Sequence, residues 1–166
     1  TVACEMKSGY GLDTESELKL LHAIVKAGAQ TMVHVVPTAC IGHAIDPDAR
    51  GGRDAFIERT IRETLPAVHS EFPGIAIDAY IEEGAWTLDE GIRLFEAALK
   101  LGHPIRVHTD QFNALGMTEW AVAHDALSVD HLEATGPEGI RKVGANDSFA
   151  VCLPVSGFHT DQRYAN

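Results

Sequence analysis

Short apolar runs of about strand length alternate along the chain with stretches of helical periodicity. The runs are rich in Val, Ile and Ala, and most lack strict alternation of apolar and polar positions. That pattern is expected of strands covered on both faces. The predicted strands are residues 2–7, 31–37, 75–82, 104–109, 127–132 and 149–153.

The stretches between these runs predict amphipathic helices. Residues 13–27 carry apolar side chains at helical spacing. Thr87 opens the helix 88–101 with Glu90 three residues later, which is a capping box. A third helix is predicted over residues 54–70, where Pro66 implies a kink or a break. Shorter helices are predicted over residues 118–124 and 137–143.

Six alternating strands and helices predict a parallel sheet, because parallel strands need crossover helices. An open doubly wound sheet and an incomplete (β/α)₈ barrel both fit. A nucleotide-binding open sheet has a glycine-rich phosphate loop, whereas Gly9-Tyr10-Gly11 lacks the third glycine. No linker interrupts residues 1–166, so we expect one domain. Residues 42–52 form the longest predicted loop, which could serve as a lid.

The charge and the cysteines narrow the function classes. The net charge of −11, from 13 basic and 24 acidic residues, makes nucleic acid and membrane surfaces poor partners, and the partner that we expect is a small-molecule substrate. Three cysteines far apart do not suggest a disulfide framework, and a reducing cytoplasm fits best. The length of 166 residues suits one ordinary domain, but a complete barrel needs about 250 residues.

Polar residues recur where the predicted strands end, and His108 and His131 are the sharpest pair. In a barrel the carboxyl ends of all strands meet at one mouth, so these residues would share a site. In one interpretation, one histidine of the pair binds a metal and the other is a neighbouring acid, base or second ligand. In the other, both are hydrogen-bonded histidines in a polar core layer. His34 reads equally as a core histidine or a substrate contact. Tyr10 could point into a cleft or lie in a surface turn. Gln111 could contact a substrate amide or cap the helix that follows it.

Several blocks together resemble the imidazolonepropionase family of the amidohydrolase superfamily, in order and spacing, from about Cys4 to Pro154. They are Glu5-Met6-Lys7-Ser8-Gly9-Tyr10-Gly11-Leu12, Glu82-Glu83-Gly84-Ala85-Trp86, Val107-His108-Thr109-Asp110-Gln111, Ala126-Leu127-Ser128-Val129-Asp130-His131-Leu132-Glu133 and Ala150-Val151-Cys152-Leu153-Pro154.

The resemblance implies a barrel enzyme of L-histidine degradation that hydrolyses the cyclic amide of 4-imidazolone-5-propanoate to N-formimidoyl-L-glutamate with one Zn²⁺ or Fe ion. By motif, His108 would be a metal ligand and His131 would help to activate the metal-bound water. Tyr10, His34 and Gln111 would contact the substrate. The intact enzyme could form a homodimer.

Two features depart from the family pattern. The loop 38–53 is longer than expected, and residues 155–160 differ from the usual continuation, so a sister amidohydrolase acting on another cyclic amide remains an alternative. The His-x-His of the first barrel strand and the Asp of the last strand, which supply the other metal ligands, are missing. We therefore expect an internal fragment with barrel strands two to seven, without turnover or a tight metal site by itself. A non-catalytic binding protein and an open-sheet enzyme are the other hypotheses.

Overall fold

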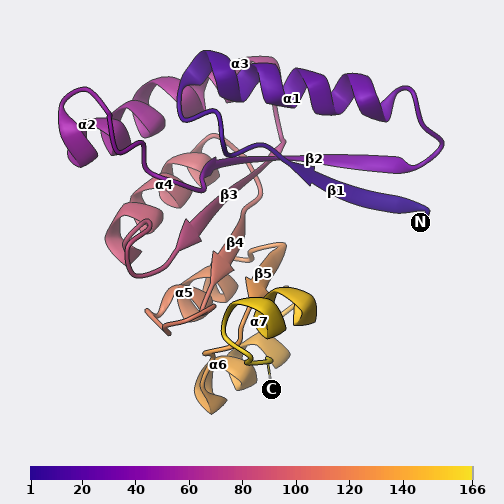
Figure 1. Ribbon diagram of the computed structural model, residues 1–166, viewed down its shortest axis with the longest axis vertical. Coiled ribbons are helices and arrows are strands. Elements are labelled where there is room, and N and C mark those ends of the chain that lie inside the picture. The colour runs from indigo at the N-terminus through magenta and orange to yellow at the C-terminus, as the bar shows by residue number, and fades with distance from the viewer. Residues whose placement is uncertain (166) are drawn as a thin grey trace.

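The computed structural model describes residues 1–165, in which six parallel strands form one curled sheet with helices on its outer side (Figure 1). The strands are ordered in the sheet as they are in the sequence, and each pairs with the next in parallel. This arrangement confirms the predicted partial barrel. The strands are β1 (Ala3–Lys7), β2 (His34–Gly42), β3 (Ala76–Ile81), β4 (Arg106–Thr109), β5 (Ser128–His131) and β6 (Phe149–Val151).

The helices follow the predicted order, and side chains cap the starts of two of them, one of which is the predicted capping box. Asp13 accepts a hydrogen bond from the Ser16 amide at the start of α1, and Thr87 and Glu90 form the capping box of α4. No described helix is long and apolar enough to cross a membrane. The helices are α1 (Thr14–Gly28), α2 (Gly52–Arg59), α3 (Leu65–Glu71), α4 (Leu88–Lys100), α5 (Met117–Ala123), α6 (Pro137–Gly144) and α7 (Pro154–Thr160).

The predicted helix 54–70 is interrupted, as Pro66 indicates. Residues Thr60–Thr64 form a π-helical turn between α2 and α3, and the Leu65 amide donates to the Thr60 carbonyl five residues back. Proline has no amide hydrogen for the usual bond four residues back, so the helix changes its hydrogen-bond pattern next to it.

Strand β2 lies further along the chain than its apolar run predicts. The expected strand was 31–37, with Pro37 as its end, but β2 starts at His34 and continues to Gly42. Pro37 pairs with Met6 inside the strand, and the five residues that follow it are all buried. At Gly42 a side chain would not fit, because an added Cβ would lie 2.5 Å from the Cβ of Ala79. The extension of β2 therefore packs closely against β3.

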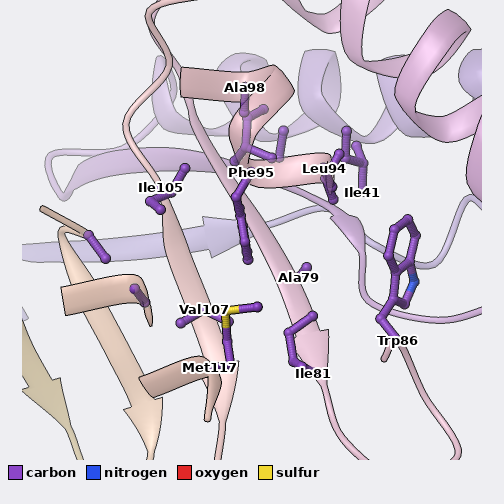
Figure 2. Close-up of a cluster of buried hydrophobic side chains, with 14 of the residues drawn as sticks. Ile41, Ala79, Ile81, Trp86, Leu94, Phe95, Ala98, Ile105, Val107 and Met117 are labelled. Carbon is purple, nitrogen blue, oxygen red and sulfur yellow. The ribbon is translucent and has the colours of Figure 1, made fainter. Parts of the chain in front are cut away.

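The apolar core lies between the strands and the outer helices. Figure 2 shows Leu94, Phe95 and Ala98 of α4 gathered over β3 and β4, and all three are completely buried. Ile81 of β3 and Val107 of β4 complete this layer, also without exposed area. Burying a side chain of this size contributes roughly 1.5–3 kcal/mol to stability, so this layer fixes the two central strands.

The concave face of the sheet is polar, which differs from the branched aliphatic filling usual for such barrels. Hydrogen bonds and ion pairs cross this face from strand to strand, as from Thr38 to Glu5 and from Arg106 to Ser128. Apolar and polar side chains therefore alternate along the strands, with the apolar ones facing the helices. The polar positions are Glu5, Lys7, Thr38, Asp78, Tyr80, Arg106, His108, Ser128 and Asp130.

Candidate active site

An open pocket of about 330 Å³ lies at the carboxyl ends of the strands. Its aromatic rings approach one another closely: ring centroids are 4.6 Å apart for Tyr10 and His43 and 5.6 Å apart for His108 and His131. His43 connects the two pairs, since its centroid lies 5.8 Å from that of His108. The lining consists of Tyr10, His43, Tyr80, His108, Gln111, His131 and Ser156.

His108 is oriented by a buried carboxylate. Its Nδ1 lies 3.1 Å from Oδ1 of Asp78, whose side chain is completely buried on β3. Burial alone would raise the pKa of Asp78, but His108 and Lys7 together outweigh burial and hold this pKa well below its usual range. An ionised carboxylate only accepts hydrogen bonds, so Nδ1 of His108 carries the hydrogen and Nε2 is left free.

Lys7 lies beneath His108 and binds two carboxylates from different strands. Its Nζ lies 2.7 Å from Oδ2 of Asp78 and 3.0 Å from Oδ2 of Asp130. Burial of the ammonium group acts to lower its pKa, but the two carboxylates raise the pKa of Lys7 above its ordinary value. Lys7 is therefore a fixed cation at the base of the pocket.

His131 ends β5 in a strained conformation. Its φ is 86° and that of Leu132 is 71°, a region that residues other than glycine seldom adopt. Its Nδ1 is buried without a hydrogen-bond partner among the described residues, and Glu133 Oε2 lies 3.7 Å away. Burial, and then the neighbouring His108, lowers the pKa of His131 to about 4. A neutral imidazole at this position can accept a proton at neutral pH.

Gln111 is held by Tyr80 and by the loop that carries it. The Tyr80 hydroxyl donates to Oε1 of Gln111 at 2.9 Å, which leaves the amide nitrogen available to a ligand. Burial and the nearby Glu82 and Glu133 raise the pKa of Tyr80 to about 12, so it remains a donor. Glu82 accepts hydrogen bonds from the backbone amides of Phe112 and Asn113 at 2.8 and 3.2 Å and so anchors this loop.

Four of the five predicted site residues, Tyr10, Gln111, His108 and His131, come together in this pocket. The structure does not bring His34 to it. His34 begins β2, pairs with Ala3 and is exposed at the opposite end of the strands. The reason is the shift of β2, because a strand that ended at Pro37 would have placed His34 near the carboxyl end.

Sequence reasoning gave His43, Tyr80 and Asp78 no part in the site, and it noted Lys7 only as a polar residue at the end of the first strand. His43 was left without a role in the loop 42–52, yet it directly follows the true end of β2 and lines the pocket. A strand boundary at Gly42 would have shown it by the same rule that singled out His108. Burial and the neighbouring His108 lower the pKa of His43, which favours its neutral form.

Two places near His108 offer metal-binding atoms. Donor atoms of Cys40, Asp78 and His108 lie within 4.8 Å of one another. In this group, however, the Asp78 carboxylate already binds the ammonium group of Lys7. Burial also raises the pKa of the Cys40 thiol, so that the thiol stays protonated. The free Nε2 of His108 fits a metal better, because metal-binding histidines usually donate their other ring hydrogen to a carboxylate.

A curled parallel sheet with its polar pocket at the carboxyl ends of the strands defines part of a (β/α) barrel. The fold is similar to that of a 5-methylcytosine deaminase from Klebsiella pneumoniae crystallised with 5-fluorocytosine. The TM-score is 0.65 at 16% identity, over 95% of this chain and 40% of the deaminase.

In sequence, the chain is similar to imidazolonepropionases over nine tenths or more of its length, which confirms the resemblance. It is 39% identical to that of Hahella chejuensis over 150 residues, covering 90% of this chain and 37% of the relative. Identity is 40% over 154 residues for Rubrobacter xylanophilus and 34% over 165 residues for Syntrophobacter fumaroxidans. These cover 93% and 99% of this chain but 36% and 39% of the relatives. The chain thus spans little more than a third of these relatives. No family model matches it.

Proposed function

We propose that the protein carrying this chain hydrolyses the cyclic amide of 4-imidazolone-5-propanoate to N-formimidoyl-L-glutamate, a step of histidine degradation. The similarity to enzymes named imidazolonepropionase supports the substrate. The observation that carries the proposal is that His108 and His131 line the same pocket, with ring centroids 5.6 Å apart. One water is consumed, the ring amide C–N bond breaks, and the carbonyl carbon becomes a carboxylate.

His108 would hold the metal through Nε2, with Asp78 on its Nδ1. A bound Zn²⁺ or Fe ion would lower the pKa of its water and polarise the ring carbonyl. The sequence contains no His-x-His, so within these residues the proposal assigns a single metal ligand.

His131 would take the proton of the attacking water. Its depressed pKa keeps the ring neutral, and its place in the pocket puts it beside His108. Gln111 would donate its amide hydrogens to a substrate oxygen, since Tyr80 occupies its Oε1. Tyr10 and His43 form the opposite wall and would contact the substrate there. His34 has no part in this proposal.

The test is loss of the imidazolone absorbance in the intact protein. His108→Ala should abolish turnover and metal binding, whereas His131→Ala should lower kcat by about 10²–10⁴-fold with the metal still bound. His22→Ala is the matched control, because His22 lies on exposed α1 and bonds only to Glu71. Wild-type turnover in His108→Ala would refute the proposal.

A second candidate is hydrolysis of a different cyclic amide. Ser156 lines the pocket from α7, within the segment that departs from the family pattern. A side chain that differs from the family pattern at this wall would change which substrate group binds there. Steady-state comparison of imidazolonepropionate with other cyclic amides decides between the two, and a higher kcat/KM for another ring would establish this second function.

A further inference from the structure

The proposed chemistry leaves the partly buried charge of Lys7 without a role. Lys7 does not line the pocket, yet it lies directly behind it and contacts carboxylates of β3 and β5. Its ammonium group is the only cation within salt-bridge distance of Asp78 besides the His108 ring, among the residues described. A partly buried lysine between two buried carboxylates is costly, because these charges are removed from water.

The two oxygens of Asp78 have different partners. Oδ2 binds Lys7 at 2.7 Å and Oδ1 binds Nδ1 of His108 at 3.1 Å. The Asp78 side chain has no exposed area, so water does not compete for either oxygen. With one oxygen fixed by the ammonium group, the carboxylate cannot rotate about its own axis without losing a charge-assisted hydrogen bond. The other oxygen is therefore fixed toward His108.

Asp130 fixes Lys7 in turn. Its Oδ2 lies 3.0 Å from Nζ on the side of β5, so the ammonium group is held from two strands. Glu5 is a third carboxylate near Nζ, at 3.5 Å. A flexible lysine side chain thereby gains one defined position, which a single ion pair would not give.

We propose that Lys7 is a positioning residue for the pocket: it locks the Asp78 carboxylate in the orientation that binds Nδ1 of His108, so that Nε2 of His108 faces the ligand. The proposal rests on the proposed function only in taking Nε2 as the metal-binding atom. The tautomer of a histidine is set by the hydrogen bond of its other nitrogen, so Lys7 acts through Asp78 on which nitrogen is free.

The test is the ¹⁵N NMR signature of His108 in the intact, metal-free protein at about pH 8.5, where an ordinary imidazole is neutral. The wild type should show a protonated Nδ1 and an unprotonated Nε2. Lys7→Met should give a mixture of the two tautomers and raise the Zn²⁺ dissociation constant about tenfold. Lys19→Met, at an exposed position of α1, should match the wild type in both measurements.

If Lys7→Met does not fold, Lys7→Gln is measured in its place, with the same expected direction. A wild-type His108 with hydrogen on Nε2 would overturn the proposal, and so would a folded Lys7 variant with unchanged tautomer and Zn²⁺ affinity. The tautomer measurement uses neither substrate nor metal. It therefore stands even if the His108 and His131 variants show that this pocket does not hydrolyse imidazolonepropionate.

Discussion

The ammonium group of Lys7 on β1 lies 3.0 Å from the carboxylate of Asp130 on β5, although three strands separate β1 from β5 in the sheet. In a flat sheet, four strand spacings of about 4.8 Å would put these strands roughly 19 Å apart. A lysine and an aspartate cannot span that distance. The ion pair is therefore possible only because the sheet is curled (Figure 1), and it links β1 to β5 across the concave face.

Removing the Lys7 charge should therefore destabilise the fold. Lys7→Met leaves the buried carboxylates of Asp78 and Asp130 without their cation, and breaking a buried pair in this way costs about 3–5 kcal/mol. Urea denaturation followed by circular dichroism measures the loss. Lys19→Met, on the exposed face of α1, should change the free energy of unfolding by less than about 0.5 kcal/mol. Equal stabilities of the two variants would contradict the prediction.

Glu82 should stabilise the loop that carries Gln111. Its carboxylate accepts hydrogen bonds from the amides of Phe112 and Asn113 and from the Asn113 side chain, and these interactions hold its pKa below the usual range although burial opposes them. Glu82→Gln replaces an acceptor by an NH₂ group that faces these donors, at a cost of about 1–3 kcal/mol.

Hydrogen exchange of the loop amides in Glu82→Gln should quicken, together with the fall in stability. The neighbouring Glu83 is exposed, so Glu83→Gln is a matched control that should leave the exchange unchanged. Unaltered protection of Phe112 and Asn113 in Glu82→Gln would show that the loop does not depend on this carboxylate.

Much of this fold could be predicted from local pattern. The capping box of Thr87 and Glu90 and the break at Pro66 both follow from rules that act within a few residues. His108 and His131 were found because each directly follows an apolar run, and parallel strands bring such positions together. These inferences required no knowledge of which strands are neighbours.

The errors and omissions involve contacts between distant segments. Strand β2 continues beyond Pro37 because its later residues pair with β3, and only the assembled sheet shows this pairing. His34 entered the predicted site through the family resemblance, and the strand boundary at Pro37 left His43 without a role. Lys7 and Asp78 are 71 residues apart, and no spacing along the chain indicates that they touch.

The buried His103, which is hydrogen-bonded to the half-buried His69, should make stability fall in acid. Nδ1 of His103 donates to the Ile75 carbonyl at 2.8 Å, so its Nε2 accepts from Nδ1 of His69 at 3.0 Å. Burial lowers the pKa of His103 despite the Ile75 bond, and His69 lowers it further. Below the unfolded value of about 6.5, the unfolded state binds more protons than the folded state, so stability decreases as the pH falls.

Urea midpoints between pH 7.5 and 5 measure this effect of His103. His103→Gln keeps a donor and an acceptor but does not titrate, so its midpoint should fall less over this range than that of the wild type. Other buried histidines contribute equally to both proteins, and the difference isolates His103. Parallel pH profiles would show that this pair does not couple folding to protonation.

Gly91 of α4 should be intolerant of any side chain, although alanine favours helices. An added Cβ would lie 2.4 Å from Cδ1 of Ile81 and 2.9 Å from Cε of Met117, inside the fully packed layer of Figure 2. Gly91→Ala should therefore reduce stability by about 1–3 kcal/mol through overpacking. Gly144→Ala at the exposed end of α6 meets no atom within 4 Å and should instead raise stability by up to about 1 kcal/mol. Thermal and urea unfolding should show that the same substitution lowers the free energy of unfolding at Gly91 and raises it at Gly144. A Gly91→Ala variant as stable as the wild type would mean that α4 can move away from β3.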